Sequence, residues 1–453
     1  MGRYLVAGVG IAGAACARAL TQRGHEVIVY NRQKDDALDA LEPVVSSVAY
    51  GETLDREVLN GVDDVVVSPG FPPHHPLVLD AIRAGHEVYS EPELAWRLRG
   101  DNPAPWLAVT GTNGKTTTVT MLAAMLEADG NTTAALGNIG LPLVDAVDAD
   151  YDVLAIELSS QQLHWSSRMA PEIGAMLNLA DDHLSWHGGY DAYAQAKRAV
   201  WRGGVCVGNA DDPQVSAFLP QMPGRHVAFT LGEPVLGQVG VADGCLVDHI
   251  GDEPVELCRV EDVHPDGGHN VANAAAAAAV ARLYGVSAAS IGNGLRGYTP
   301  QPHRNVEVAV VDGVRYIDDS KGTNPHATAA AISSYDRIVW IAGGQLKGVD
   351  IDSLVADSAH RLSAAVLLGT DRAEIAAALE RHAPGIPVVQ VATTSPEAMT
   401  EVVASAKELA KPGDVVLLSP AAASYDMFSG YPQRGRLFAQ AVRETQESAT
   451  VVR

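Results

Sequence analysis

Positive charge is scarce in this sequence. The 32 Lys and Arg residues face 55 Asp and Glu residues, which gives a formal net charge of -23 at pH 7. Such an acidic balance argues against a nucleic-acid backbone as partner. It does not exclude small phosphate ligands, because backbone amides and a few cations can bind them locally. The rare lysines are Lys34, Lys115, Lys197, Lys321, Lys347, Lys407 and Lys411.

Cysteine and long apolar runs are also scarce. Four cysteines lie far apart, without the close pairs of a metal site, so we expect buried and reduced thiols. No apolar run is long enough to span a bilayer. No basic region precedes the first apolar run at residues 4–8, so no signal peptide is expected. These absences favour a soluble, cytoplasmic protein without membrane insertion.

Strand-like apolar runs alternate with helical stretches along the whole chain, which predicts an α/β fold with parallel sheets. A chain of 453 residues is too long for one core. We expect a Rossmann-like N-terminal domain at 1–98, a P-loop central ATPase domain at 99–300 and a Rossmann-like C-terminal domain at 301–453. Polar, proline-bearing segments at 99–105 and 300–302 mark the two boundaries. The expected strands include 27–30, 65–67, 106–109, 153–156, 175–179, 306–311, 337–342, 364–368 and 415–418.

The strongest motif is a glycine-rich loop between an expected strand and an expected helix. It consists of Gly111, Thr112, Asn113, Gly114, Lys115, Thr116 and Thr117. Glycines let backbone N–H groups surround phosphate oxygens, and the helix N-terminus adds partial positive charge. Lys115 can reach the terminal phosphates, and a threonine hydroxyl can bind Mg²⁺. The alternative is a plain strand-to-helix turn with a surface lysine.

A second glycine-rich turn follows the first expected strand. Its residues are Gly8, Gly10, Ile11 and Gly13, and a neighbouring turn contributes Ser68 and Gly70. The pattern is similar to a dinucleotide fingerprint. Asn31, however, ends the next strand where a dehydrogenase normally has Asp or Glu. The turn equally suits the diphosphate of another nucleotide, or only close strand–helix packing.

Polar groups that suit a hard cation follow the central strands. Glu157 comes after one strand, His183 follows the next, and Lys197 lies further along the chain. Glu157 is a reasonable Mg²⁺ ligand, whereas His183 is less usual because hard cations prefer oxygen. Zinc is disfavoured, since no cysteine joins these residues. His183 alone would equally suit a hydrogen-bonded helix cap.

Polar loops also follow the strands of the last segment. They carry Lys321, Lys347 and Ser424, a set that suits a dicarboxylate. On spacing alone, ordinary polar loops at strand ends explain these residues equally well.

Together these motifs resemble the Mur ligases of peptidoglycan precursor synthesis, in particular the members that add glutamate. The matching segments, in chain order, are GTNGKTT at 111–117, GNIGLP at 137–142, ELSSQQL at 157–163, HNVAN at 269–273, DSKGTNP at 319–325 and LLSPAAASYDMF at 417–428. They fall in all three expected domains, so chance similarity is an inadequate explanation.

The resemblance implies an ATP-dependent ligase whose partners are UDP-N-acetylmuramoyl-L-alanine, D-glutamate and ATP, acting as a monomer with two Mg²⁺ ions. ATP would phosphorylate the alanine carboxylate, and the glutamate amine would displace phosphate. The resemblance also assigns site residues to each ligand. ATP would be bound by the loop 111–117 with Asn270, Arg304 and Asp319, and the metal by Thr116, Glu157, His183 and a carbamylated Lys197. The UDP substrate would be bound by the N-terminal turns with Asn31, Asn138, Ser159 and Gln162, and glutamate by Lys321, Thr323, Lys347, Ser424, Tyr425 and Tyr431. Lys115, Asn138, His183 and Lys197 would act in catalysis.

Four positions depart from the pattern of these ligases. Gln161 replaces the usual aromatic residue, Ala422 stands where Cys is frequent, Tyr431 replaces Phe, and Asn31 replaces Asp. They bear on the pocket assignments more than on the reaction class.

Two alternatives stay open from the sequence. One is another amino-acid or folate ligase with the same phosphate loop; folate ligases, however, begin with the ATP domain and lack the turn at residues 8–13. The other is a nucleotide-binding switch or motor without ligase chemistry, which would need neither a carbamylated lysine nor a dicarboxylate site.

Overall fold

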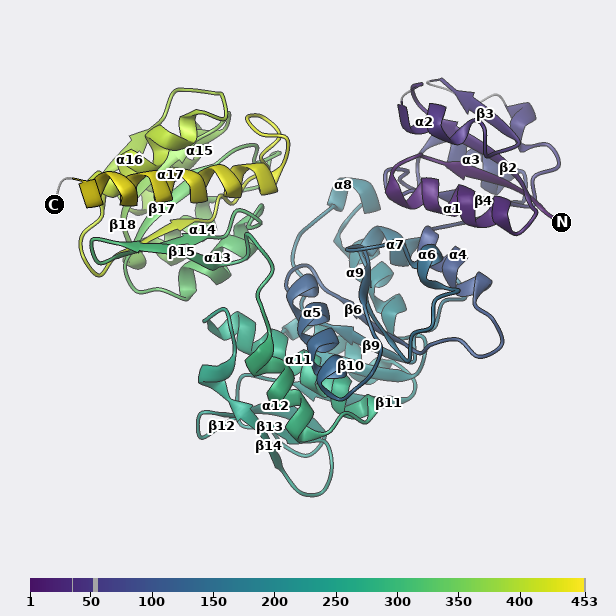
Figure 1. The fold of residues 1–453 in the computed structure, drawn as a ribbon, viewed down its shortest axis with the longest axis horizontal. Coiled ribbons are helices and arrows are strands. Elements are labelled where there is room, and N and C mark those ends of the chain that lie inside the picture. Colours follow the sequence, from purple (N-terminus) through teal and green to yellow (C-terminus); the bar gives the residue numbers. More distant parts are fainter. Residues whose placement is uncertain (35, 52–55, 452–453) are drawn as a thin grey trace. The chain divides into compact units, whose positions relative to one another are not determined.

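The computed structural model describes residues 1–34, 36–51 and 56–451. Its strands form three sheets (Figure 1), and the chain divides into two compact units. One unit comprises Met1–Asp262 with Val271–Tyr298, and the other comprises Val263–Asn270 with Thr299–Arg453. The expected separation of residues 1–98 from 99–300 stays a prediction, since one compact unit holds both.

The first sheet has five parallel strands in the order β3-β2-β1-β4-β5. The strands are β1 (Arg3–Ala7), β2 (Glu26–Asn31), β3 (Ser47–Tyr50), β4 (Asp64–Val67) and β5 (Glu87–Tyr89), and the helices are α1 (Ile11–Gln22), α2 (Asp36–Leu41), α3 (Pro76–Arg83) and α4 (Glu91–Leu98). Successive side chains of a strand face opposite sides of a sheet. Accordingly Leu5 packs with α3 residues, whereas Val6 packs with residues of α1 and α2.

The second sheet has nine strands in the order β14-β13-β12-β11-β10-β9-β6-β8-β7. The strands are β6 (Trp106–Thr110), β7 (Ala135–Gly137), β8 (Leu154–Glu157), β9 (Ile173–Met176), β10 (Val205–Asn209), β11 (Arg225–Phe229), β12 (Gln238–Ala242), β13 (Cys245–His249) and β14 (Val255–Arg259). Those from β7 to β12 pair in parallel, and β12 to β14 form an antiparallel extension.

Eight α-helices accompany this sheet. They are α5 (Lys115–Ala128), α6 (Leu143–Ala146), α7 (Ser160–His164), α8 (Leu184–His187), α9 (Tyr190–Arg198), α10 (Pro213–Phe218), α11 (Gly268–Tyr284) and α12 (Ala288–Gly297). The alanine run at 274–279 in α11 is completely buried, so it is a close-packed helix face. One hydrophobic core runs from α1 through Trp106 to Trp201, which joins the first two sheets into one unit.

The third sheet has six strands in the order β15-β16-β20-β17-β18-β19, and only β15 is antiparallel to its neighbour. The strands are β15 (Val306–Val311), β16 (Val314–Asp318), β17 (Ile338–Gly343), β18 (Leu362–Leu368), β19 (Val388–Gln390) and β20 (Val415–Leu418), and the helices are α13 (Pro325–Ser333), α14 (Asp352–Ser358), α15 (Arg372–His382), α16 (Ala398–Leu409) and α17 (Tyr431–Val451). Trp340 belongs to the core under α13, α14 and α15, whereas Val339 packs with α16 and α17. Figure 1 shows α17 running along α16.

The α/β architecture with largely parallel sheets is therefore confirmed. The antiparallel extension β12–β14 and the strands β3, β5, β7, β10, β11, β16 and β19 were not anticipated from the sequence. One expected strand ends early: β9 stops at Met176, after which the chain turns to contact the phosphate loop, where the Thr112 N–H donates to the Asn178 carbonyl at 3.0 Å. Among the described helices, none is both long enough and apolar enough to cross a membrane.

Candidate active site

The phosphate loop lies between the end of β6 and the start of α5. Gly114 has a left-handed backbone with φ of +84°, and a Cβ there would collide with the Asn273 side chain, so glycine is required. Asn178 braces the loop: its side chain accepts from the Asn113 N–H at 2.8 Å and donates to the Asn113 carbonyl at 3.1 Å. A braced glycine turn before a long helix suits phosphate binding.

The side chains of Lys115 and Tyr193 form hydrogen bonds with residues of this loop. Lys115 folds back and donates to the carbonyl oxygens of Gly111 and Thr112 at 2.9 and 2.8 Å. The Thr112 hydroxyl lies 2.7 Å from the Tyr193 hydroxyl. Tyr193 was not predicted as a site residue, although its position on α9, one helical turn before Lys197, is a signal that could have identified it.

Three of the predicted residues meet at the end of β8. The Thr116 hydroxyl donates to one carboxylate oxygen of Glu157 at 2.6 Å, and the Asn138 side-chain amide donates to the other at 2.8 Å. Glu157 is only 2% exposed. The sequence segments that carry them are far apart, and the parallel pairing of β6, β8 and β7 brings them to one edge of the sheet. A hydroxyl and a carboxylate in contact form an oxygen donor set that suits Mg²⁺.

Lys197 is buried beside this group. Its side-chain nitrogen donates to the Gly111 carbonyl at 2.7 Å, and its exposed fraction is 2%. Burial, and then the charge of Lys115, hold the pKa of Lys197 well below its usual value, although Asp182 and Glu157 act in the opposite direction. No ion pair of Lys197 occurs among the described residues. An amine in such surroundings favours the neutral form.

His183 lies at the start of α8 rather than directly after a strand. It adopts a left-handed backbone with φ of 51°, and its imidazole is half exposed at 3.6 Å from the Asp182 carboxylate. In the described part of the chain, no three His, Cys, Asp or Glu side chains gather as a metal site would. That arrangement is compatible with Mg²⁺, which takes many of its ligands from water and phosphate oxygens.

The predicted UDP-substrate turn lies at the carboxyl ends of β1, β2 and β4. Gly8 has a φ of +93°, and a Cβ on Gly13 would collide with the Gly8 carbonyl. Ser68 packs against Gly8 from the end of β4, while Ile11 is 81% exposed at the start of α1. The structure thus brings the turn at 8–13 and the turn at 68–70 together, at the edge where parallel sheets place ligands. Asn31 ends β2 and donates from its side chain to the Gln33 carbonyl at 3.2 Å.

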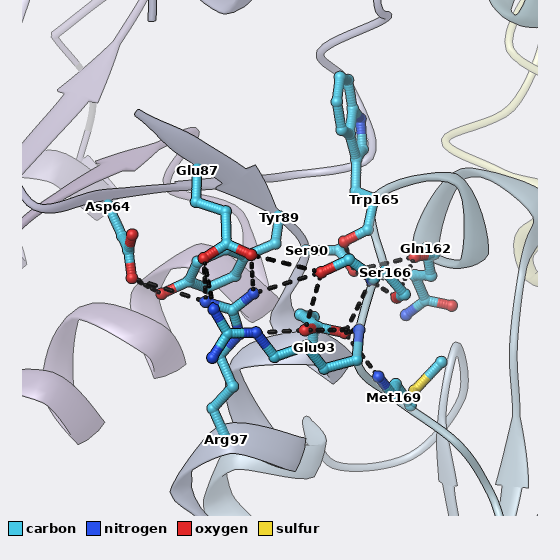
Figure 2. Close-up of polar contacts among 12 residues, drawn as sticks. Asp64, Glu87, Tyr89, Ser90, Glu93, Arg97, Gln162, Trp165, Ser166 and Met169 are labelled. Carbon is cyan, nitrogen blue, oxygen red and sulfur yellow. Dashed lines mark hydrogen bonds and ion pairs between the residues drawn. The ribbon is translucent and has the colours of Figure 1, made fainter. Parts of the chain in front are cut away.

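The helix α7 carries the two other residues predicted for this substrate. Ser159 and Gln162 form a reciprocal capping box, with hydrogen bonds of 3.2 and 2.9 Å between side chain and backbone. Ser90, at the end of the first sheet, donates its hydroxyl to the Gln162 carbonyl at 2.9 Å and its N–H to the Trp165 carbonyl at 2.8 Å (Figure 2). The first sheet is therefore hydrogen-bonded directly to the α7 segment.

A buried carboxylate strengthens this connection. Glu93 is completely buried and accepts hydrogen bonds from three successive backbone N–H groups at residues 167–169, at 2.9 to 3.1 Å. Arg97 donates to Glu93 at 3.0 Å and to Glu87 at 2.7 Å, and its guanidinium stacks on Tyr89 at 3.9 Å (Figure 2). Sequence reasoning did not identify this network, because its members are distant in sequence and individually ordinary.

In the second unit, Asp318 ends β16 and Asp319 directly follows it. Asp318 lies 2.6 Å from the His303 ring nitrogen, and Asp319 accepts a hydrogen bond from the Ser419 hydroxyl at 2.7 Å. Burial raises the pKa of Asp319 to about 7, with the Ser419 hydrogen bond acting against it. The guanidinium of Arg304 also acts electrostatically on Asp319. The structure thus brings two of the predicted ATP residues, Arg304 and Asp319, together.

Asn270, the third predicted ATP residue in this unit, is 3% exposed and lies within donor distance, 3.5 Å, of the Asp266 carbonyl. The phosphate loop belongs to the other compact unit.

The predicted glutamate residues lie on three loops after β16, β17 and β20, except Tyr431, which begins α17. The Lys321 nitrogen lies 4.0 Å from the centre of the Tyr431 ring, and the Lys347 nitrogen lies 6.0 Å from that of Tyr425. Ser424 is buried in the loop after β20, with 2% of its surface exposed. Both cations face the π-surface of a tyrosine, a placement that orients an ammonium group.

Arg434 was not anticipated, yet it links these loops. The side chain is completely buried and donates to the Ser320 carbonyl at 2.8 Å, the Ala422 carbonyl at 3.2 Å and the Gly343 carbonyl at 3.3 Å. Burial lowers the pKa of Arg434 to about 10, despite the opposing charges of nearby aspartates. One buried arginine therefore fixes the three loops that the sequence suggested for a dicarboxylate.

Comparison with known proteins decides the family. Residues 2–90 match the N-terminal domain of MurD-like Mur ligases, residues 109–281 match the Mur ligase middle domain, and residues 303–422 match the Mur ligase glutamate ligase domain. A relative from Streptomyces coelicolor, named UDP-N-acetylmuramoylalanine--D-glutamate ligase, is 50% identical over 97% of each chain. The chain belongs to the Mur ligase family. Mur ligases form amide bonds at the expense of ATP in peptidoglycan precursor synthesis, so the expected reaction class is confirmed.

Further relatives carry the same name. The protein of Thermobifida fusca is 48% identical, covering 97% of this chain and 98% of its own, and that of Mycolicibacterium smegmatis is 44% identical, covering 97% and 96%. Among solved structures, a pseudomurein peptide ligase type C from Methanothermus fervidus superposes with a TM-score of 0.60 at 17% identity, over 98% of this chain and all of that one. The UDP-N-acetylmuramate-alanine ligase of Thermotoga maritima gives 0.59 at 16%. These structures share the Mur ligase fold.

Proposed function

We propose that this Mur ligase joins D-glutamate to UDP-N-acetylmuramoyl-L-alanine, using ATP to convert the alanine carboxylate into an acyl phosphate. The observation that carries the proposal is the contact of Thr116, Glu157 and Asn138 at the end of β8, beside the phosphate loop and the buried Lys197. Relatives of that name, about half identical over nearly the whole chain, support the choice of substrates.

Phosphoryl transfer requires that charge on the phosphates be neutralised and that both reactants be held in line. The loop at 111–117 would hold the phosphates by its N–H groups, with Lys115 released from the Gly111 and Thr112 carbonyls to face the transferred group. Asn270, Arg304 and Asp319 would hold the remainder of the nucleotide.

Magnesium, when bound, would neutralise phosphate charge and draw electrons from the transferred group. Thr116 and Glu157 fit this ion because their oxygens already lie in contact, and His183 and Lys197 would complete two such sites. The neutral Lys197 amine would add to CO₂ and lose a proton, which forms an N–C bond and leaves an anionic carbamate with oxygen ligands. Burial of the amine favours the neutral form that this addition needs.

The UDP substrate would bind along the turns at 8–13 and 68–70 and against α7, which carries Ser159 and Gln162. Asn138 would then orient the alanine carboxylate, since its amide already donates beside the phosphate loop. The amino acid would bind to Lys321, Thr323, Lys347, Ser424, Tyr425 and Tyr431. In this proposal residues 1–98 form the domain that binds the UDP substrate, residues 99–300 the domain that binds ATP, and residues 301–453 the domain that binds the amino acid.

Phosphate release from ATP and UDP-N-acetylmuramoyl-L-alanine, measured with single amino acids, tests the proposal. Release should require D-glutamate and should not occur with alanine, lysine or diaminopimelate. Release with diaminopimelate instead would assign the chain to a different step of the same pathway. Release that needs no amino acid at all would contradict the ligase assignment. The alternative of a switch or motor is already wrong, because the chain belongs to a ligase family.

A further inference from the structure

A buried group of polar side chains joins α7 to α8 in the central sheet region. Its members are Gln161, Ser160 and His187, which are 9%, 2% and 7% exposed. The His187 Nε2 atom lies 2.9 Å from the Ser160 hydroxyl, and that hydroxyl donates to the Gln161 side-chain oxygen at 3.3 Å. We call these residues the polar trio.

The direction of the hydrogen bonds fixes the form of His187. Because the Ser160 proton points to Gln161, the Ser160 oxygen accepts from Nε2–H of the imidazole. The other ring nitrogen, Nδ1, is buried and has no hydrogen-bond partner among the described residues, as expected of an unprotonated nitrogen. Burial, followed by the charges of His164, His183 and Lys197, lowers the pKa of His187 to about 4. His187 is therefore a neutral donor.

The polar trio spans the two segments that carry the proposed metal ligands. Ser160 lies three residues after Glu157, and the His187 N–H donates to the His183 carbonyl at 3.1 Å. The four-residue helix α8 is thus joined to the Glu157 segment by the side-chain hydrogen bond between His187 and Ser160. On its other side, the Trp186 indole donates to the Pro69 carbonyl at 3.0 Å.

His183 itself needs such support. Its left-handed backbone, with φ of 51°, is unfavourable for a residue with a Cβ and persists only where the surroundings impose it. The Trp186 and His187 N–H groups both donate to the His183 carbonyl, at 3.0 and 3.1 Å, so α8 determines the orientation of that peptide. Displacement of α8 would therefore reorient the imidazole.

We propose that His187 is a positioning residue of the metal site: its hydrogen bond to Ser160 holds α8 so that His183 faces the same ions as Glu157. The proposal rests on the proposed metal ligands. It also gives a role to Gln161, which departs from the aromatic residue usual in Mur ligases and here accepts a hydrogen bond from the Ser160 hydroxyl. Side chains that orient metal ligands in this way commonly alter metal affinity 10- to 100-fold when removed.

The test compares His187→Phe, which keeps a ring but removes the hydrogen bond, with Ser160→Ala and with the double variant. His164→Phe is the matched control, since His164 packs in the same aromatic group, 5.8 Å from the His187 ring, without a hydrogen bond to Ser160. Mn²⁺ binding with a non-hydrolysable ATP analogue is followed by electron paramagnetic resonance. Hydrogen exchange of residues 181–189 is measured in the metal-free protein.

We expect His187→Phe and Ser160→Ala each to weaken Mn²⁺ binding about tenfold, to leave the KM for glutamate unchanged and to accelerate exchange at 181–189. The double variant should bind Mn²⁺ no more weakly than the worse single variant, because both substitutions remove the same hydrogen bond. His164→Phe should behave as wild type. Wild-type Mn²⁺ affinity in Ser160→Ala, which is the milder change, or additive losses in the double variant, would overturn the proposal.

Glu157→Gln separates this inference from the site on which it rests. If Glu157→Gln weakens Mn²⁺ binding and Ser160→Ala does not, only the role of His187 is wrong. If neither variant changes Mn²⁺ binding, the metal assignment itself is wrong.

Discussion

The side-chain nitrogen of Lys197 lies 2.7 Å from the carbonyl oxygen of Gly111, so a completely buried lysine ends inside the phosphate loop. The cost of burying an unpaired ammonium group is high, and it lowers the pKa of Lys197 toward the neutral amine. The same loss makes the amine a nucleophile for CO₂. The side-chain nitrogen of Lys197 is therefore both the donor to the Gly111 carbonyl and the atom that we propose reacts with CO₂.

Lys197→Ala should be nearly inactive, because it removes the anion that the carbamate would supply to the metal. Short carboxylates added to the assay should restore part of the activity, since they can occupy the space of the carbamate. Intact-protein mass measured under CO₂ should include one additional CO₂ in the wild type and none in the variant. Lys34→Ala, at a half-exposed position, is the control. Full activity of Lys197→Ala would show that this lysine is only structural.

Lys115→Ala removes the cation that we propose turns from the Gly111 and Thr112 carbonyls to the transferred phosphate. We expect kcat to fall by about 10²-fold, the usual scale for one transition-state electrostatic contact. Lys411→Ala, on the exposed surface, should leave kcat unchanged. Steady-state kinetics at saturating ATP measure both variants. Turnover near that of the wild type in Lys115→Ala would contradict the assignment of the phosphate loop.

Lys347→Ala should raise the KM for glutamate and leave that for ATP little changed. The Lys347 ammonium faces the Tyr425 ring on the loops that Arg434 fixes, so its loss leaves an acidic side chain of the substrate without a counter-charge. We expect the preference for glutamate over neutral amino acids to fall on the order of 10²-fold, the effect of losing a charge-assisted contact that the substrate makes when bound. Equal changes in both KM values would instead indicate a general disturbance of the second unit.

Glu91 provides a pH test of stability. Burial raises its pKa from 4.5 to about 7, although backbone N–H groups of Val144 and Leu143 act against the shift. The folded protein therefore binds a proton that the unfolded chain has lost, and stability from this group declines as the pH rises from 4.5 to about 7. The full effect is about 3 kcal/mol at most.

Glu91→Gln removes this titration while keeping an acceptor for the Val144 N–H, which lies 2.8 Å from the carboxylate. Relative to wild type, the variant should gain stability between pH 5 and pH 8, a comparison available from thermal midpoints. Glu401→Gln, at an exposed position, should follow the wild type at both pH values. A constant difference between Glu91→Gln and wild type across this range would contradict the raised pKa.

Local sequence was sufficient for the features that depend on neighbouring residues. The phosphate loop could be predicted because a strand, a glycine turn and a helix follow one another in the chain, as β6, residues 111–114 and α5 do. The glycine turn after β1 was predicted for the same reason. Gly8 and Gly114 both have the positive φ that only glycine adopts without strain.

Features that depend on distant residues could not be predicted in this way. Arg434 contacts loops more than ninety residues earlier, and Glu93 contacts backbone groups at 167–169. Neither residue stands in a local motif, so only the folded chain reveals them. The role of Lys197 came from resemblance to Mur ligases, and the structure adds its burial and its hydrogen bond to Gly111.

The central claim is that ATP activates the alanine carboxylate as an acyl phosphate, and the most direct test follows the oxygen atoms of that carboxylate. UDP-N-acetylmuramoyl-L-alanine is labelled with a heavy oxygen isotope in the alanine carboxylate, and the reaction is run with ATP and D-glutamate. An acyl phosphate intermediate transfers one carboxylate oxygen to the released phosphate, so the phosphate should carry one labelled oxygen for each amide bond formed. Amide formation with unlabelled phosphate would contradict activation of the carboxylate by ATP.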